Sequence, residues 1–184
     1  EALWRALAES QLSVAVMRIF RDPGQMNAVT LELPFSSMRA SLDGMGITSF
    51  ENDRDGIIRS LQAYDFFGEQ IYYNWAFEVA RLHLNTQPPS NISSTSLTFN
   101  GQNIPLQRGD LIVNMDGPAG TVPTYSAIAV MEGDVMEQNP DAFRGKIVLI
   151  GLTSITLKDL FPTPFSAQEL MPGVEIVANA VDMI

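Results

Sequence analysis

Side chains that could carry out chemistry are scarce in this sequence, which limits the reactions it could catalyse. His83 is the single histidine and the chain has no cysteine, so a serine triad or a histidine-containing metal site would depend on this one side chain. It falls near the end of a helical pattern over 71–84, where an imidazole interacts with the last carbonyl groups of the helix. No carboxylates are spaced around it as ligands. We therefore expect no catalytic residue, no metal site and no cofactor.

The segment 51–56 (ENDRDG) has the beginning of a calcium-binding loop but not its end. Asp53, Asp55 and Gly56 stand at the positions that an EF-hand loop requires. The ninth position is Arg59 and the twelfth is a glutamine, so the bidentate acidic ligand is missing and a cation stands inside the loop. We interpret this segment as a solvated turn before a strand, and an ion pair from the aspartates to Arg59 would brace it.

A polar loop after the apolar run 146–151 (KIVLIG) is a third candidate. A glycine and a Thr/Ser pair after a strand begin many phosphate-binding sites, but no second glycine and no Gly-Lys-Ser/Thr follow here. Two nearby prolines exclude a long helix. The loop is therefore either a rigid connector or a small-ligand site at the carboxyl end of a sheet strand. The residues of that ligand site would be Arg59, Thr153, Ser154, Asp159 and Thr163.

Length and charge exclude several classes of function. The 184 residues suffice for one domain with its own core, and the net charge of −10 disfavours nucleic acid as a partner. No apolar run approaches the roughly 20 residues that span a bilayer. The sequence opens and closes within helical patterns, so we expect residues 1–184 to be a single domain excised from a longer membrane protein.

Strands are predicted where short runs of apolar and β-branched residues end at turn residues. They cover 12–20, 28–33, 57–64, 110–115 and 146–151. The last two are continuous apolar runs, as expected of strands that are covered on both faces. Asn100-Gly101 lies between short alternating runs over 97–106, which predicts a β-hairpin.

Helices are predicted where apolar residues recur every three or four positions. They cover 2–7, 36–42, 71–84, 125–133 and 174–184. Strands and helices alternate along the chain, so the sequence predicts an α/β fold: a single domain with a mixed β-sheet flanked by helices and one β-hairpin.

Several motifs occur in an order that resembles a known sensor family. They are the D-x-DG-x-x-R turn at 53–59, LIVN at 111–114, GKIVLIG at 145–151, LKD at 157–159, TP at 163–164 and MPGVEI-x-AN at 171–179. From about residue 34 onward the chain is similar to the type-2 CHASE domain, a sensor domain associated with cyclases and histidine kinases. The resemblance gives the motif residues a structural role: Asp53, Asp55, Gly56, Gly151, Gly173 and Asn179.

The resemblance implies an extracytoplasmic domain of a bacterial membrane receptor. Such a domain binds a small molecule or responds to another signal, and passes it through its terminal helices and the receptor's membrane helices to a cytoplasmic output module. That module would be a nucleotide cyclase, a histidine kinase, a Ser/Thr kinase or a diguanylate cyclase. The family's closing motif usually has histidine before Ala-Asn, and this chain has Val177 there. This difference favours a structural role for the motif.

Two alternatives belong to other classes of protein. The first is an interaction module that forms a homodimer without a ligand. The second is a small α/β hydrolase, against which stand the missing G-x-S-x-G motif, the missing cysteine and the missing histidine cluster. We expect a non-enzymatic domain.

Overall fold

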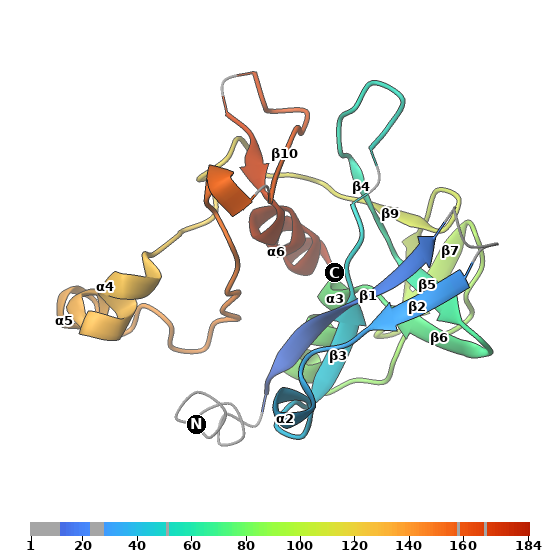
Figure 1. Cartoon of the computed structure of the whole chain (residues 1–184), viewed down its shortest axis with the longest axis horizontal. Helices are drawn as coiled ribbons and strands as arrows, with labels where there is room; N and C mark the ends of the chain where they lie inside the picture. The colour runs from blue at the N-terminus through green and yellow to red at the C-terminus, as the bar shows by residue number, and fades with distance from the viewer. Residues whose placement is uncertain (1–11, 23–27, 51, 158, 168) are drawn as a thin grey trace.

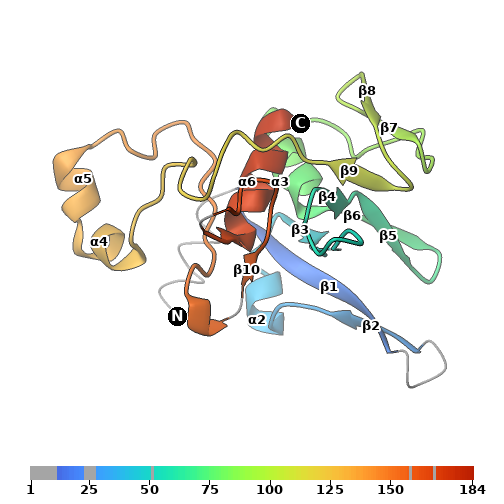
Figure 2. The same ribbon diagram turned by 90° about the horizontal axis from the view of Figure 1, so that it is seen from above.

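The computed structural model describes residues 12–22, 28–50, 52–157, 159–167 and 169–184. Several small β-sheets lie beside two helices that pack against each other, α3 and α6, while an arm with α4 and α5 extends away from them (Figures 1 and 2). The predicted mixed α/β class is confirmed, although the strands form several small sheets in place of one. The predicted helix 2–7 lies outside the described residues.

The N-terminal sheet has three strands in the order β2-β1-β3. β1 (Val14–Asp22) pairs antiparallel with β2 (Ala28–Glu32) and parallel with β3 (Gly44–Ile47), and the short helix α2 (Ser36–Arg39) lies between β2 and β3 in the chain. The predictions for β1, β2 and α2 are confirmed. β3 was not predicted, because its two glycines hide the apolar pattern of a strand.

A hairpin leads directly into α3. β5 (Tyr64–Phe67) and β6 (Gln70–Tyr73) pair antiparallel, and α3 (Trp75–Leu84) begins after Asn74, whose side chain accepts a hydrogen bond from the Ala76 N–H at 3.0 Å. The predicted helix 71–84 is therefore wrong over its first three residues, which form β6. Gly68, with φ of +62°, allows the tight turn that pairs them with β5.

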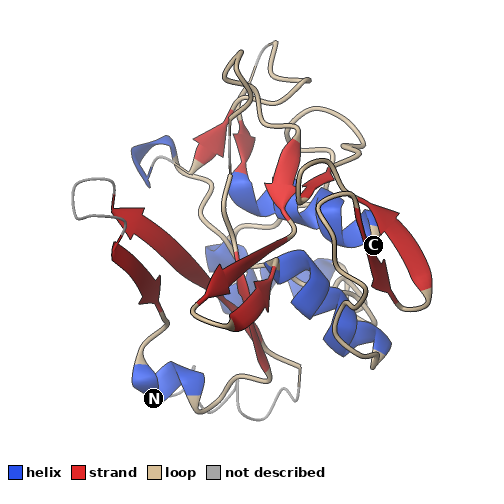
Figure 3. Ribbon diagram, turned by 90° about the vertical axis from the view of Figure 1, so that its right-hand side faces the viewer, coloured by secondary structure: helices blue, strands red, loops and turns tan. Residues whose placement is uncertain are grey.

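A second hairpin and a pair of distant strands complete the sheets. β7 (Ser96–Phe99) and β8 (Gln102–Pro105) flank the Asn100-Gly101 turn, in which both residues have positive φ, so the predicted hairpin is confirmed. β4 (Ser60–Gln62) pairs antiparallel with β9 (Asp110–Ile112). Figure 3 shows how strands and helices are distributed in the domain.

The core lies between β4, β7, β9, α3 and α6 (Gly173–Met183), which confirms the predicted C-terminal helix. Each of the five elements contributes at least one fully buried large side chain: Leu61, Phe77, Leu97, Phe99, Leu111 and Ile176. Two short strands, β10 (Leu160–Phe161) and β11 (Met171–Pro172), pair antiparallel just before α6. They place the start of α6 beside the segment 159–163.

The predicted strand at 146–151 is wrong in this arrangement. The chain leaves β9, forms α4 (Ala127–Glu132) and α5 (Asp134–Gln138) on the arm, and returns through 146–151 as an extended segment to a 3-10 helix, η1 (Ile155–Leu157). A continuous apolar run forms a buried strand only if another strand supplies hydrogen bonds. No described strand pairs with this run. The helix predicted at 125–133 is confirmed as α4.

None of the described helices has the length and apolar character needed to cross a membrane.

Candidate functional site

The turn at 53–59 is braced by Arg59. Its guanidinium contacts Asp53 Oδ2 at 2.6 Å and both carboxylate oxygens of Asp55 at 3.0 and 2.8 Å. The Gly56 N–H donates to the Asp53 carbonyl, and Gly56 has φ of +80°, which favours glycine. The interpretation of this segment as an ion-paired turn is confirmed. Two carboxylates already surround the Arg59 guanidinium, which limits its capacity to bind an anion.

The contact with Arg59 lowers the pKa of Asp55. The hydrogen bond from Arg59 is the largest cause that lowers the Asp55 pKa, to about 2, and the Arg59 pKa is raised in turn. Because the folded-state pKa is depressed, the stabilisation from this pair is complete above the unfolded pKa of about 3.9 and is lost as the pH falls through about 2.

We expect Arg59→Ala to return the Asp55 pKa toward its ordinary value, since the variant removes the charged donor. A pH titration of the Asp55 carboxyl carbon by NMR measures this shift. Arg54→Ala is the matched control, because Arg54 belongs to the same exposed turn and has no bond to Asp55. If the Asp55 carboxyl still titrated with a midpoint near 2 in the Arg59 variant, Arg59 would not be the cause of the lowered pKa.

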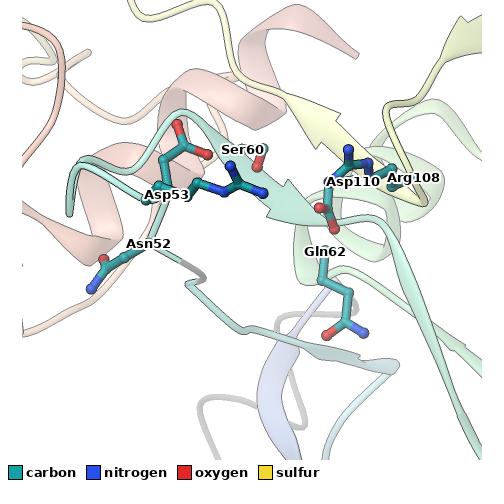
Figure 4. Close-up of a pocket in the computed structure, with 7 residues that line it drawn as sticks. Asn52, Asp53, Ser60, Gln62, Arg108 and Asp110 are labelled. Carbon is teal, nitrogen blue, oxygen red and sulfur yellow. The ribbon is translucent and has the colours of Figure 1, made fainter.

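A polar cavity of about 440 Å³ lies next to this turn. Ser60 and Gln62 line it from β4, while Leu61 between them points to the core and is fully buried. Asp110 stands opposite Gln62 in the β4–β9 register, and Arg108 precedes it (Figure 4). The wall toward the turn comes from residues 52–54. The cavity therefore carries charges of both signs, from two arginines and two aspartates.

The segment 159–163 packs between the turn and the start of α6. The Ile58 N–H donates to the Pro162 carbonyl at 2.8 Å, and the Gly173 N–H donates to the Asp159 carbonyl at 3.0 Å. Burial raises the pKa of the Asp159 carboxyl. A Cβ on Gly173 would lie 2.9 Å from Asp159 Oδ1, so this glycine allows the close approach. These two bonds join the segment 159–163 to Ile58 on one side and to α6 on the other.

The other predicted ligand residues have local partners. Thr163 is 3% exposed, and its hydroxyl and N–H both contact the Ser166 hydroxyl. Thr153 and Ser154 are exposed, and Ser154 Oγ accepts from the Thr156 N–H at the start of η1. Within the described part of the chain, neither of these two residues is hydrogen-bonded to Arg59, Asp159 or Thr163. The structure therefore places Asp159 and Thr163 on one segment, which pairs with Ile58 through Pro162, and leaves Thr153 and Ser154 on a separate loop.

Buried polar side chains on α6 hold the loop at 116–122. The Glu175 carboxylate, 6% exposed, accepts from the Gly120 N–H at 2.9 Å and the Val122 N–H at 3.1 Å. One turn later, Asn179 Oδ1 accepts from the Asp116 N–H at 2.9 Å. Sequence reasoning did not single out Glu175. A carboxylate on the apolar face of an amphipathic helix was the signal that could have identified it.

Val177, at the position where the resemblance led us to expect histidine, is 2% exposed and lies in the core. Its side chain packs among apolar neighbours on the face of α6 that the domain buries. Together with Glu175 and Asn179, it shows that this motif joins α6 to the domain.

The described residues show no cluster of metal-ligating side chains. They contain no group of three or more histidine, cysteine, aspartate or glutamate side chains that could hold a metal ion. The His83 side chain, near the end of α3, makes no hydrogen bond or ion pair to another described residue.

The family comparison gives this domain its class. The model of the CHASE2 domain matches residues 1–184, so the chain belongs to the CHASE2 domain family. Members of this family are typically extracytoplasmic sensor domains of signalling proteins and are generally non-catalytic. No curated protein and no solved structure matched the chain.

Proposed function

We propose that this chain is the signal-input domain of a bacterial transmembrane receptor and that α6 carries the signal out of it. The observation that supports this most directly is the attachment of α6 to the loop at 116–122 through Glu175 and Asn179. Because these contacts are buried and hydrogen-bonded, a rearrangement of that loop would move α6. The receptor's membrane helices would pass that movement to a cytoplasmic nucleotide cyclase, histidine kinase, Ser/Thr kinase or diguanylate cyclase.

The signal in this proposal is a small polar molecule that binds beside β4 and β9. The cavity is lined by Arg54 and Arg108 as well as Asp53 and Asp110, so a ligand with both a carboxylate and an ammonium group would find partners for both charges. Arg59 is paired with Asp53, which lines the cavity, and Asp159 lies outside the cavity lining, on the segment that pairs with Ile58. Thr153, Ser154 and Thr163 would act indirectly, by shaping the loop and the segment before α6.

A ligand screen tests this proposal. We expect a member of a panel of amino acids to raise the unfolding temperature by several degrees, because binding at about 100 times Kd stabilises the folded state by roughly 2.7 kcal/mol. Arg108→Ala and Asp110→Ala should each abolish the shift. Arg59→Ala and Asp159→Ala should weaken it. Hydrogen exchange of α6 amides should change on binding.

Arg144→Ala is the matched control, because it removes an exposed ion pair with Asp141 on the arm and should leave the shift unchanged. A thermal shift that survives both cavity variants would exclude this cavity as the site. Binding without any change in α6 exchange would contradict the signalling route and leave the cavity assignment standing.

A further inference from the structure

The apolar run at 146–151 is exposed and unpaired. Ile147, Val148 and Ile150 are 36%, 51% and 83% exposed. Residues 147–153 have no main-chain hydrogen bond to another described residue. This combination is unusual for a run of β-branched residues, since such residues favour paired, half-buried strands.

β9 has an open edge that could pair with such a run. The Val113 N–H donates to the Arg59 carbonyl and the Ala63 N–H donates to the Gly109 carbonyl, so the odd-numbered residues of this strand face β4. In an antiparallel ladder, the residues that alternate with these direct their N–H and C=O groups away from the partner strand. The backbone of Ile112 and Asn114 therefore lies on the free edge, where no other described strand pairs with it.

The helix α6 already holds both segments close together. Gly151 packs against Val174 so tightly that a Cβ on this glycine would lie 2.4 Å from the valine Cβ. One turn and a half along the same helix, Asn179 binds the N–H of Asp116, just after β9. Leu149 also packs against the core cluster. The C-terminal end of the run and the residue that follows β9 closely thus both contact α6.

We propose that residues 146–151 pair in parallel with the open edge of β9 in the same chain, as a second arrangement in which the arm closes onto the sheet. The connection from β9 through α4 and α5 back to 146–151 has the form of a β-α-β unit, whose crossover joins parallel strands. Closure pairs the free backbone groups of both segments. It requires rotation of the arm and leaves the core in place.

The side chains of the run suit this arrangement. In a strand, Ile147 and Leu149 share one face and Val148 and Ile150 share the other. The first pair would extend the buried face of Leu111 and Val113. The second pair would extend the exposed face at Ile112, which is 45% exposed. The exposed apolar residues of α4, Ile128 and Met131, would then cover this outer face.

Cysteine cross-linking tests the pairing directly, because the chain has no native cysteine. Parallel neighbours in a sheet bring Cα atoms to about 5 Å, within disulfide range. We expect Ile112→Cys with Val148→Cys to form a disulfide within one chain on oxidation of the intact chain at low concentration. The control pair, Ile112→Cys with Ile155→Cys, should stay reduced. Absence of the first disulfide, or its formation only between two chains, would overturn the proposal; the latter outcome would indicate exchange of the arm between copies.

A lysine introduced on the outer face of the run tests closure independently, through the unfolding temperature. Ile150 and Ile155 are 83% and 82% exposed, so lysine at either position should be equally harmless if the arm remained open. With closure, Ile150→Lys buries a charge and should lower the unfolding temperature by about 5 °C or more, while Ile155→Lys should leave it unchanged. Equal temperatures for the two variants would contradict closure.

Discussion

Alanine in place of Gly46 is expected to destabilise the folded domain by about 3 kcal/mol, because the added methyl group would overlap rigid backbone. The Cβ would lie 2.4 Å from Trp75 Cα and 2.7 Å from Trp75 N. These atoms belong to the first residue of α3, which the Asn74 cap and the core hold in place. Chemical denaturation measures the expected fall in the free energy of unfolding.

Gly44→Ala is a matched control on the same strand. Its Cβ would meet the ends of two side chains, Glu78 Oε2 at 3.2 Å and Leu82 Cδ1 at 3.4 Å. Flexible side-chain ends can move by a few tenths of an ångström, and losing a glycine lowers the entropy of the unfolded chain. We expect a change within about 0.5 kcal/mol. Equal losses for the two variants would show that α3 does not press on β3 as described.

Glu175→Ala is expected to cost about 3 kcal/mol of stability, because it leaves two loop N–H groups without their charged acceptor. Those groups belong to Gly120 and Val122, and the glutamate itself is 6% exposed. The loss should appear as a lower free energy of unfolding. Amide hydrogen exchange at Gly120 and Val122 should also become faster, since their hydrogen bonds are gone.

Two further variants on α6 distinguish the hydrogen bonds of the Glu175 carboxylate from a general loss of helix stability. Asp182→Ala removes an exposed carboxylate from the same helix and should change stability by less than about 0.5 kcal/mol. Glu175→Gln keeps an oxygen acceptor without the charge and should fall between the two. If Glu175→Ala left the loop amides protected, the contact between α6 and the loop would not depend on this carboxylate.

Local patterns in the sequence were enough to predict the elements that depend on neighbours along the chain. The Asn100-Gly101 turn, the final helix and the strand β1 each follow from residues within one short window. The start of α3 could not be located in this way. Ile71 to Tyr73 continue the apolar pattern of the helix, and only pairing with β5 makes them a strand.

In the candidate site, too, local features were predictable from the sequence and long-range contacts were not. The brace from Arg59 to Asp53 and Asp55 lies within one turn, so its spacing was visible in the sequence. The cavity joins that turn to Arg108 and Asp110, which only the β4–β9 pairing brings near. The loop contacts of Glu175 span 55 and 53 positions, and no local pattern predicts contacts across such a separation.

The position of α6 in the core also determines when the chain can fold. Leu61 of β4, Phe77 of α3 and Leu111 of β9 share one core with Ile176 of α6. During synthesis the hairpins can form as they emerge, but their apolar faces stay open to water until the residues of α6 arrive. Contacts between distant parts of a chain also slow folding, because long loops must close first. The nascent domain therefore exposes an aggregation-prone hydrophobic surface for most of its synthesis, until α6 packs against it.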